Sequence, residues 1–266
     1  MHRADTARRA DAPQSQNRNA SLKYCPVVAQ IWGDAGPQMT NIPPQLEIPF
    51  VGRWHYSRAE MIADGIVHAV GIVLAIAAGS TLLALAAFRV GPGEYIAAAF
   101  YVVSLLTVLS VSLAYNLWPV SSPAKWVLRR FDHAAIYLLI AATYTPFLAQ
   151  LDASPLARWM IVLVWIAAAA GIAIKVFFPG RFDRLAIVFY LAIGWSGIVL
   201  VKPLVETLPT TSIVLIVAGG VVYSCGVIFF AWKGLRFHNA LWHGFVVTGA
   251  GLHLAAMVDC LVINRF

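Results

Sequence analysis

Long apolar segments, almost free of charged residues, constrain the fold of this chain more than any other feature of its sequence. Each is close to the roughly 20 residues that an α-helix needs to cross the hydrocarbon core of a bilayer. Breaks rich in Gly, Pro or charge separate them. We expect seven spans, at about 61–88, 93–117, 133–151, 156–177, 185–203, 209–232 and 240–262. The pattern predicts an all-α, polytopic membrane protein with a seven-transmembrane helix bundle; six spans would result if the third and fourth were one helix.

Composition and charge agree with this interpretation. The chain is 60% hydrophobic and 12% charged, whereas a soluble domain carries about 25% charged residues. The net charge of +7 could suggest a nucleic-acid partner, but the Lys and Arg residues lie in the N-terminal segment and near the ends of apolar runs. Membrane lipids are therefore the expected partners, and no nucleic acid is expected.

The distribution of basic residues predicts the orientation in the membrane. The breaks after spans two, four and six hold eight Lys and Arg residues, those after the other spans hold four, and seven precede span one. Because cytoplasmic loops carry the excess of basic residues, we expect a cytoplasmic N-terminus, in a bacterial plasma (inner) membrane. Residues 1–52 are predicted to form a disordered cytoplasmic tail, and residues 53–266 the membrane domain.

Polar residues inside the spans are the first place to seek chemistry, because charged side chains in hydrocarbon usually face the bundle interior or water. In the first span, Glu60, Asp64 and His68 recur every four residues and share one helical face. Two interpretations stay open for this stripe. It either makes helix–helix hydrogen bonds near the membrane surface or takes a direct part in a site.

A second polar group comes from three separate spans. Ser112 and Asn116 lie one turn apart near the end of span two, Asp132 lies at the predicted start of span three, and Asn239 and His243 lie at the start of span seven. The predicted topology brings all these helix ends to the cytoplasmic side. We therefore expect Asn116, Asp132, Asn239 and His243 at one depth.

Three segments carry a resemblance to a known family. They are Glu60 to His68, the stretch 128–147 (LRRFDHAAIYLLIAATYTPF), and the stretch 241–249 (LWHGFVVTG) followed by His253. The pattern resembles the haemolysin III family, within the wider group of progestin and adipoQ receptors. The resemblance covers about residues 55–263, and the segment in span three is its most specific part.

This resemblance implies a zinc ion near the cytoplasmic face, held by three His, with a Ser beside it and an Asp bonded to it through water. By position these become Asn116, Asn239 and His243 as ligands, with Ser112 and Asp132 retained. A neutral amide is a weak zinc donor, so two of the three ligands are degenerate. His68 is the better substitute if span one packs against spans two and seven. A hydrogen-bonded polar cluster without metal is the competing interpretation.

The resemblance also implies a function, a lipid-directed, metal-dependent hydrolase acting on a lipid amide or ester, with Ser112 and Asp132 as catalytic residues. The degenerate zinc positions leave enzyme activity open. A membrane pore-forming (cytolytic) protein, or a receptor for a lipid or small molecule, is the alternative without catalysis. A proton-coupled transporter that uses Glu60, Asp64, His68 and Asp132 as relays is a weaker third hypothesis.

Overall fold

The computed structural model describes residues 56–151, 154–180 and 182–264, and these form helices joined by short turns. The predicted tail, residues 1–52, lies outside the described residues. The helices are α2 (Arg58–Ala86), α3 (Pro92–Leu117), α4 (Pro123–Leu148), α5 (Pro155–Phe177), α6 (Asp183–Trp195), α7 (Val201–Thr207), α8 (Thr210–Ala231) and α9 (His238–Val258). Three shorter elements, η3 (Ala149–Leu151), η4 (Ser196–Leu200) and η5 (Asp259–Ile263), extend or connect them.

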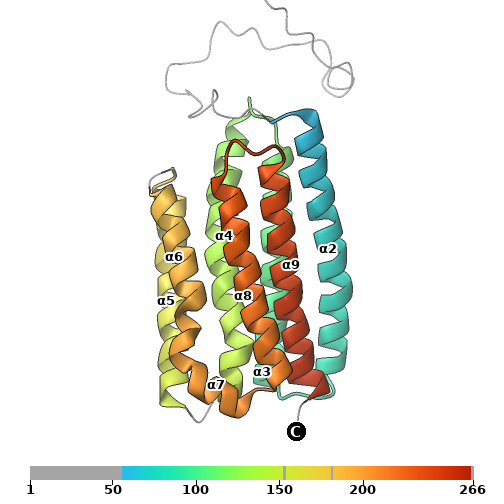
Figure 1. Cartoon of the computed structure of the whole chain (residues 1–266), viewed down its shortest axis with the longest axis vertical. Coiled ribbons are helices and arrows are strands. Elements are labelled where there is room, and N and C mark those ends of the chain that lie inside the picture. The colour runs from blue at the N-terminus through green and yellow to red at the C-terminus, as the bar shows by residue number, and fades with distance from the viewer. Residues whose placement is uncertain (1–55, 152–153, 181, 265–266) are drawn as a thin grey trace, which may run out of the picture. The chain divides into compact units, whose positions relative to one another are not determined.

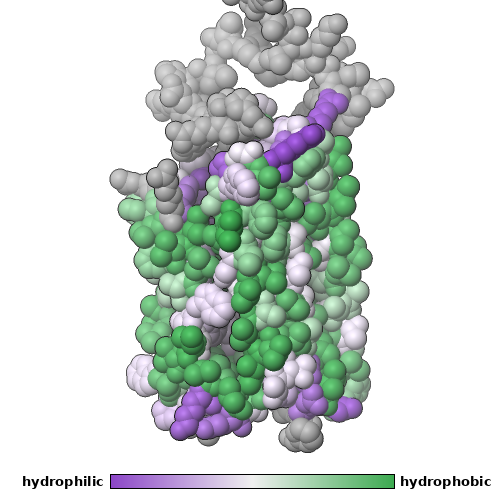
Figure 2. Space-filling model, in the orientation of Figure 1, coloured by the Kyte–Doolittle hydropathy of each residue, from purple (hydrophilic) through white to green (hydrophobic). Residues whose placement is uncertain are grey.

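Within the part of the chain that the structure describes, seven helical stretches are long and apolar enough to cross a membrane, which confirms the predicted number of spans. Three of them combine elements, because α4 continues into η3, α6 runs through η4 into α7, and α9 ends in η5. Figure 2 shows hydrophobic residues over most of the visible face of the bundle, with hydrophilic residues at its two ends. The protein is therefore an integral membrane protein. Which end faces the cytoplasm stays a prediction.

The third span begins ten residues earlier than expected, at Pro123 and not at 133. Ser122 caps the helix, with its side chain accepting a hydrogen bond from a backbone N–H. The sequence suggested a loop here because Lys125 is charged, but its Nζ donates to the backbone oxygens of Tyr115 at 2.8 Å and Trp118 at 3.0 Å. The last carbonyls of α3 thus satisfy a buried ammonium. Three basic residues that the sequence placed in a loop belong to α4: Lys125, Arg129 and Arg130.

The helix α2 packs against both α3 and α9, and α9 also packs against α8. A Cβ atom added to Gly71 would lie 2.7 Å from Cγ2 of Val247, so α2 and α9 approach too closely there for a larger residue. Because the spans alternate in direction, α2, α4, α6 and α9 begin at the end drawn uppermost in Figure 1, where α3, α5 and α8 finish. We call it the upper end. Because α2 packs against both α3 and α9, His68 on α2 can approach the site residues on those two helices.

Candidate metal centre

The first turns of α2 carry three polar side chains from the upper end into the bundle. Ser57 caps the helix, and its side-chain oxygen accepts from the Glu60 backbone N–H while the Glu60 carboxylate accepts from the Ser57 backbone N–H at 2.8 Å. One turn further on, Asp64 is only 3% exposed, and after another turn His68 is fully buried. The polar stripe predicted from the sequence therefore enters the interior.

The hydrogen bonding of His68 leaves one ring nitrogen free. Its Nδ1 lies 2.8 Å from the backbone oxygen of Asp64. A carbonyl oxygen only accepts, so Nδ1 carries the hydrogen and the neutral ring keeps a lone pair on Nε2. That Nε2 is buried and has no hydrogen-bond partner. His68 thus presents an unused nitrogen ligand atom in the interior of the bundle.

The helix α9 brings His243 against the same carboxylate. Nδ1 of His243 lies 2.6 Å from Oδ1 of Asp64, and its Nε2 lies 3.3 Å from the Ser112 hydroxyl on α3. The rings of His68 and His243 are 4.3 Å apart between centroids. The second carboxylate oxygen of Asp64, Oδ2, is buried without a hydrogen-bond partner and lies 3.6 Å from Nδ1 of His68. Asp64 is therefore a shared anion between two imidazoles, with one oxygen that accepts no hydrogen bond.

Asp64, His68 and His243 together fit a metal ion. Each offers one ligand atom, and these atoms all lie within 4.8 Å of one another. Buried polar atoms in proteins are nearly always hydrogen-bonded, so two unpartnered ligand atoms in one cluster call for an explanation. A cation accepts lone pairs from both at once. The three side chains sit close enough to hold a metal ion, and we call them the metal cluster.

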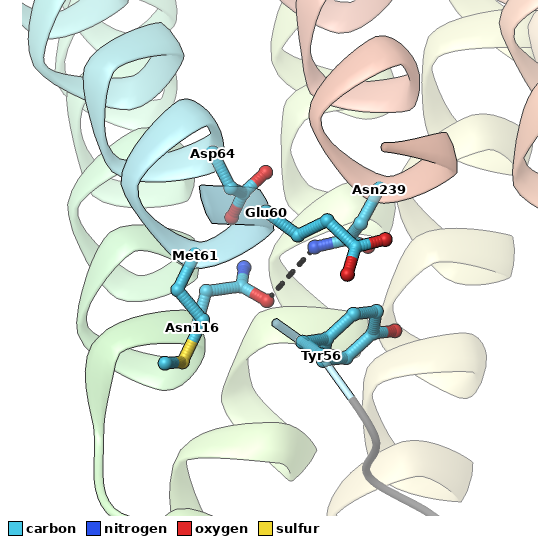
Figure 3. A pocket seen from close by; sticks show the side chains of 6 residues that line it. All are labelled: Tyr56, Glu60, Met61, Asp64, Asn116 and Asn239. Carbon is cyan, nitrogen blue, oxygen red and sulfur yellow. Dashed lines mark hydrogen bonds between the residues drawn. The ribbon is translucent and has the colours of Figure 1, made fainter. Parts of the chain in front are cut away.

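The two asparagines at the expected ligand positions are occupied by other bonds. Nδ2 of Asn239 donates to Oδ1 of Asn116 at 3.1 Å (Figure 3), and Nδ2 of Asn116 donates to the backbone oxygen of Ser112 at 2.9 Å. The amide pair and Asp64 line the same small cavity. The structure thus places Asn116 and Asn239 near His243, but as a hydrogen-bonded pair. Their assignment as ligands stays a prediction.

Asp132 stands apart from the metal cluster. It lies nine residues into α4, because that helix starts earlier than the sequence suggested. Its carboxylate is 3.5 Å from Nδ1 of His133 and has a Coulombic interaction with His68. Within the described residues, no hydrogen bond joins Asp132 to Asp64, His68 or His243. Its catalytic role therefore stays a prediction that requires proton transfer over some distance, for example through water.

A small cavity opens from the upper end onto Asp64. It is lined by Tyr56, Glu60, Met61, Asp64, Asn116 and Asn239, as Figure 3 shows, and we call it the mouth. Its volume of about 10 Å³ is room for roughly one water molecule. Partial burial raises the pKa of the Tyr56 phenol above its usual value, and the negative charges of Asp64 and Glu60 raise it further. The mouth is therefore a narrow, electronegative opening.

Another carboxylate at the upper end, Asp183 at the start of α6, is fully paired. Its two oxygens accept from Arg129 at 2.6 Å and from Lys175 at 2.7 Å. Burial alone would raise the pKa of Asp183, but the bonds to Lys175 and Arg129 outweigh burial and bring the pKa below its ordinary value. Two cations thus neutralise Asp183, and this group tethers α4, α5 and α6.

Comparisons with known proteins agree with this architecture. Residues 57–254 match the family model described as "Haemolysin-III related". The chain is 39% identical over 204 residues to "Hemolysin-3 homolog" of Bacillus subtilis, covering 76% of this chain and 93% of that protein. It is 38% identical over 194 residues to "Hemolysin-3" of Bacillus cereus, covering 73% and 88%. The human "Monocyte to macrophage differentiation factor" is 31% identical over 216 residues, covering 79% and 87%. This chain belongs to the haemolysin III-related family of membrane proteins.

Proposed function

We propose that this protein is a metal-dependent hydrolase of lipid amides or esters, embedded in a bacterial plasma membrane. The observation that carries the proposal is the metal cluster, in which Oδ2 of Asp64 and Nε2 of His68 are buried without partners beside His243. Two imidazoles and a carboxylate are the ligand set of many catalytic zinc sites, so zinc is the metal we propose. A bound zinc ion would supply Lewis-acid polarisation and lower the pKa of water.

The protein's own residues would perform the remaining steps. Asp64 holds His243 through the 2.6 Å bond to Nδ1 and so fixes the ring with Nε2 toward Ser112. The Ser112 hydroxyl would then donate a hydrogen bond to the oxyanion that forms when water adds to the substrate carbonyl. Asp132 would take the proton from that water through a relaying water molecule and return it by the same route to the leaving amine or alcohol. The products are a fatty acid and the amine or alcohol released from the lipid.

Access for a lipid requires movement of the helices. The mouth has room for about one water molecule and cannot admit an acyl carbonyl with its chain. A lipid carbonyl would therefore reach the metal cluster from the side of the bundle, between helices that separate to admit it. The apolar outer surface keeps such a substrate in the surrounding bilayer until then.

Turnover of defined lipids tests the proposal. Purified full-length protein is mixed with N-acyl and O-acyl lipids in detergent micelles, and free fatty acid is measured by mass spectrometry with and without zinc. We expect zinc-dependent release that falls about 10²- to 10⁴-fold in Asp132→Asn, as for loss of a general base, and about 10²- to 10³-fold in Ser112→Ala, as for loss of an oxyanion donor. Asp183→Asn removes a carboxylate at the same end and is the matched control. Turnover equal in Asp132→Asn and Asp183→Asn contradicts the proposed chemistry.

The names of two relatives favour a second function, membrane lysis, because both are called hemolysins. If the protein forms a pore, liposomes that contain it at low protein density should release dye. The release should not depend on Asp132 or on added zinc. A receptor role for a lipid or small molecule likewise stays a prediction. Dye retention by liposomes that contain correctly inserted protein argues against the pore.

A further inference from the structure

We infer that the mouth is a port through which the metal ion reaches the metal cluster from the water at the upper end, with Glu60 attracting the ion and the Asn116–Asn239 pair controlling its passage. The inference rests on the proposed metal binding but not on the proposed hydrolysis. Its basis is the juxtaposition, in the lining of one narrow cavity, of a surface carboxylate, two amides and Asp64, whose Oδ2 has no hydrogen-bond partner.

The size of the mouth selects for small species. Its volume of about 10 Å³ fits one water molecule or one partly dehydrated ion. The side chains around it supply oxygen atoms from Glu60, Asp64, Asn116 and Asn239, which can replace part of an ion's hydration shell. Among the described residues, no Lys or Arg lines the mouth. An anion would meet two carboxylates there, whereas a divalent cation would be attracted.

Asp64 connects the mouth to the metal cluster. It lines the cavity and is also hydrogen-bonded to His243, so one side chain faces both compartments. Its Oδ2 is buried and unpartnered. An ion that exchanges water for oxygen ligands in the mouth can therefore keep Asp64 as a ligand while it gains the nitrogens of His68 and His243. The nitrogen ligands of the metal cluster suit zinc better than the oxygen ligands of the mouth do. Transfer of the ion from the mouth to the metal cluster is therefore favoured.

Two hydrogen bonds tie the walls of the mouth together. Oε1 of Glu60 accepts from the backbone N–H of Phe237 at 3.1 Å, which joins the start of α2 to the start of α9. The bond from Asn239 to Asn116 joins α9 to the end of α3 at 3.1 Å. Phe237 has φ of 61°, in the left-handed region that bulky residues rarely adopt, and its backbone N–H is the donor to Glu60. Opening the port requires that the amide pair separate.

Metal-loading kinetics test the port without any measurement of turnover. Chelator-stripped protein in detergent is mixed with Co²⁺ in a stopped-flow instrument, and the visible absorption of bound Co²⁺ reports loading. Excess EDTA added to loaded protein then reports release. We expect Glu60→Gln to slow loading about 3- to 10-fold, because one attracting charge is lost. Asn239→Ala should speed both loading and release about fivefold, the effect of one ordinary hydrogen bond. Final occupancy should stay unchanged in both.

The chain offers matched controls at the opposite end. Glu94 also lies at the third position of its helix and accepts from the capping residue's N–H, so Glu94→Gln controls for lost capping. Asn264, like Asn239, donates a hydrogen bond from its side-chain amide, in this case to Asp259, so Asn264→Ala controls for a lost amide. Both should load like the natural protein. For the natural protein itself, loading should slow as ionic strength rises, which needs no variant.

The outcomes separate the two proposals. Loading and release rates in Glu60→Gln and Asn239→Ala equal to those of the controls, or loading insensitive to salt, overturn the port and leave the hydrolase standing. Loading as expected without lipid turnover overturns the hydrolase and supports the port. Failure of the natural protein to bind Co²⁺ or zinc overturns both.

Discussion

Two buried aspartates at opposite ends of the bundle differ in how their charges are satisfied. Asp259, 6% exposed, accepts from the Ser212 hydroxyl at 2.7 Å through one oxygen and from the Asn264 amide at 2.7 Å through the other. Asp64, 3% exposed, uses one oxygen for His243, and its other oxygen has no hydrogen-bond partner and lies 3.6 Å from Nδ1 of His68. Both carboxylate oxygens of Asp259 are therefore satisfied by hydrogen bonds within the protein. Asp64 keeps an oxygen that accepts no hydrogen bond, and on this ground we propose the metal at that end.

The largest expected effect is the loss of metal when a ligand is removed. His243→Ala and His68→Ala should each lower the amount of bound zinc from about one per protein to less than about a tenth, because a remaining pair of ligands holds zinc weakly. His253→Ala is the matched control, since His253 lies on α9 but bonds to the backbone oxygen of Ile216. Elemental analysis after gel filtration measures the ratio. A zinc content unchanged in both ligand variants would mean that His68 and His243 do not hold the metal. The contrast between Asp64 and Asp259 would then have no functional meaning.

The second expected effect is a metal-dependent difference in stability. Zinc at about 100 times its dissociation constant should stabilise the natural protein by about 2.7 kcal/mol relative to the chelator-treated form. Asp64→Asn should abolish that difference. Asp259→Asn should instead destabilise the protein by about 1–3 kcal/mol whether or not zinc is present, because it disrupts a satisfied buried network. Thermal unfolding of the three proteins in detergent, with zinc and with EDTA, gives all six values, and a zinc-dependent shift that survives in Asp64→Asn would contradict the assignment.

A smaller effect should separate the serines of the two clusters. Ser212→Ala removes a 2.7 Å hydrogen bond to Asp259 and should lower the free energy of unfolding by about 1.5–3 kcal/mol, the range for bonds to charged groups. Ser112→Ala removes only the 3.3 Å contacts with His243 and Asn116, so its cost should stay below about 1 kcal/mol. Equilibrium unfolding of the metal-free proteins compares them. Equal costs would mean that both clusters are structural.

The smallest expected effect concerns Asp183, which is at the same end as Asp64 but is neutralised by Arg129 and Lys175. Because its pKa is lower when folded than the ordinary value near 3.8, its ionised form stabilises the fold above that pH. This stabilisation is lost as the pH falls through the folded pKa. Asp183→Asn should therefore flatten the dependence of unfolding temperature on pH below about 4. A pH profile identical to that of the natural protein would show that the ion pairs of Asp183 with Arg129 and Lys175 do not stabilise the fold.

Much of the fold could be predicted from the sequence, because the thickness of the bilayer sets the length of each apolar run. The second span, expected at 93–117, is the helix Pro92–Leu117. The third span shows the limit of this reasoning. Its first turns contain Lys125, and hydropathy cannot reveal that the carbonyls at the end of α3 will accept the ammonium. The start of the helix was therefore wrong by ten residues.

The site could be predicted only in part. The four-residue spacing of Asp64 and His68 places them on one face, and the sequence pointed to His68 as a substitute ligand. The bond between Asp64 and His243 joins residues 179 positions apart, and spacing within one helix carries no information about it. The role of Asp64 as a ligand candidate was consequently missed. Asp259 was missed too, although an aspartate inside the last apolar run was a visible signal.

Metal content of the purified natural protein, measured beside the Asn116→His/Asn239→His double variant, tests the central claim most directly. If Asp64, His68 and His243 form the site, the natural protein holds about one zinc ion per chain without any change at the two asparagines. Zinc that is absent from the natural protein but present at about one per chain in the double variant would contradict the account. The metal would then require the histidines that this chain lacks.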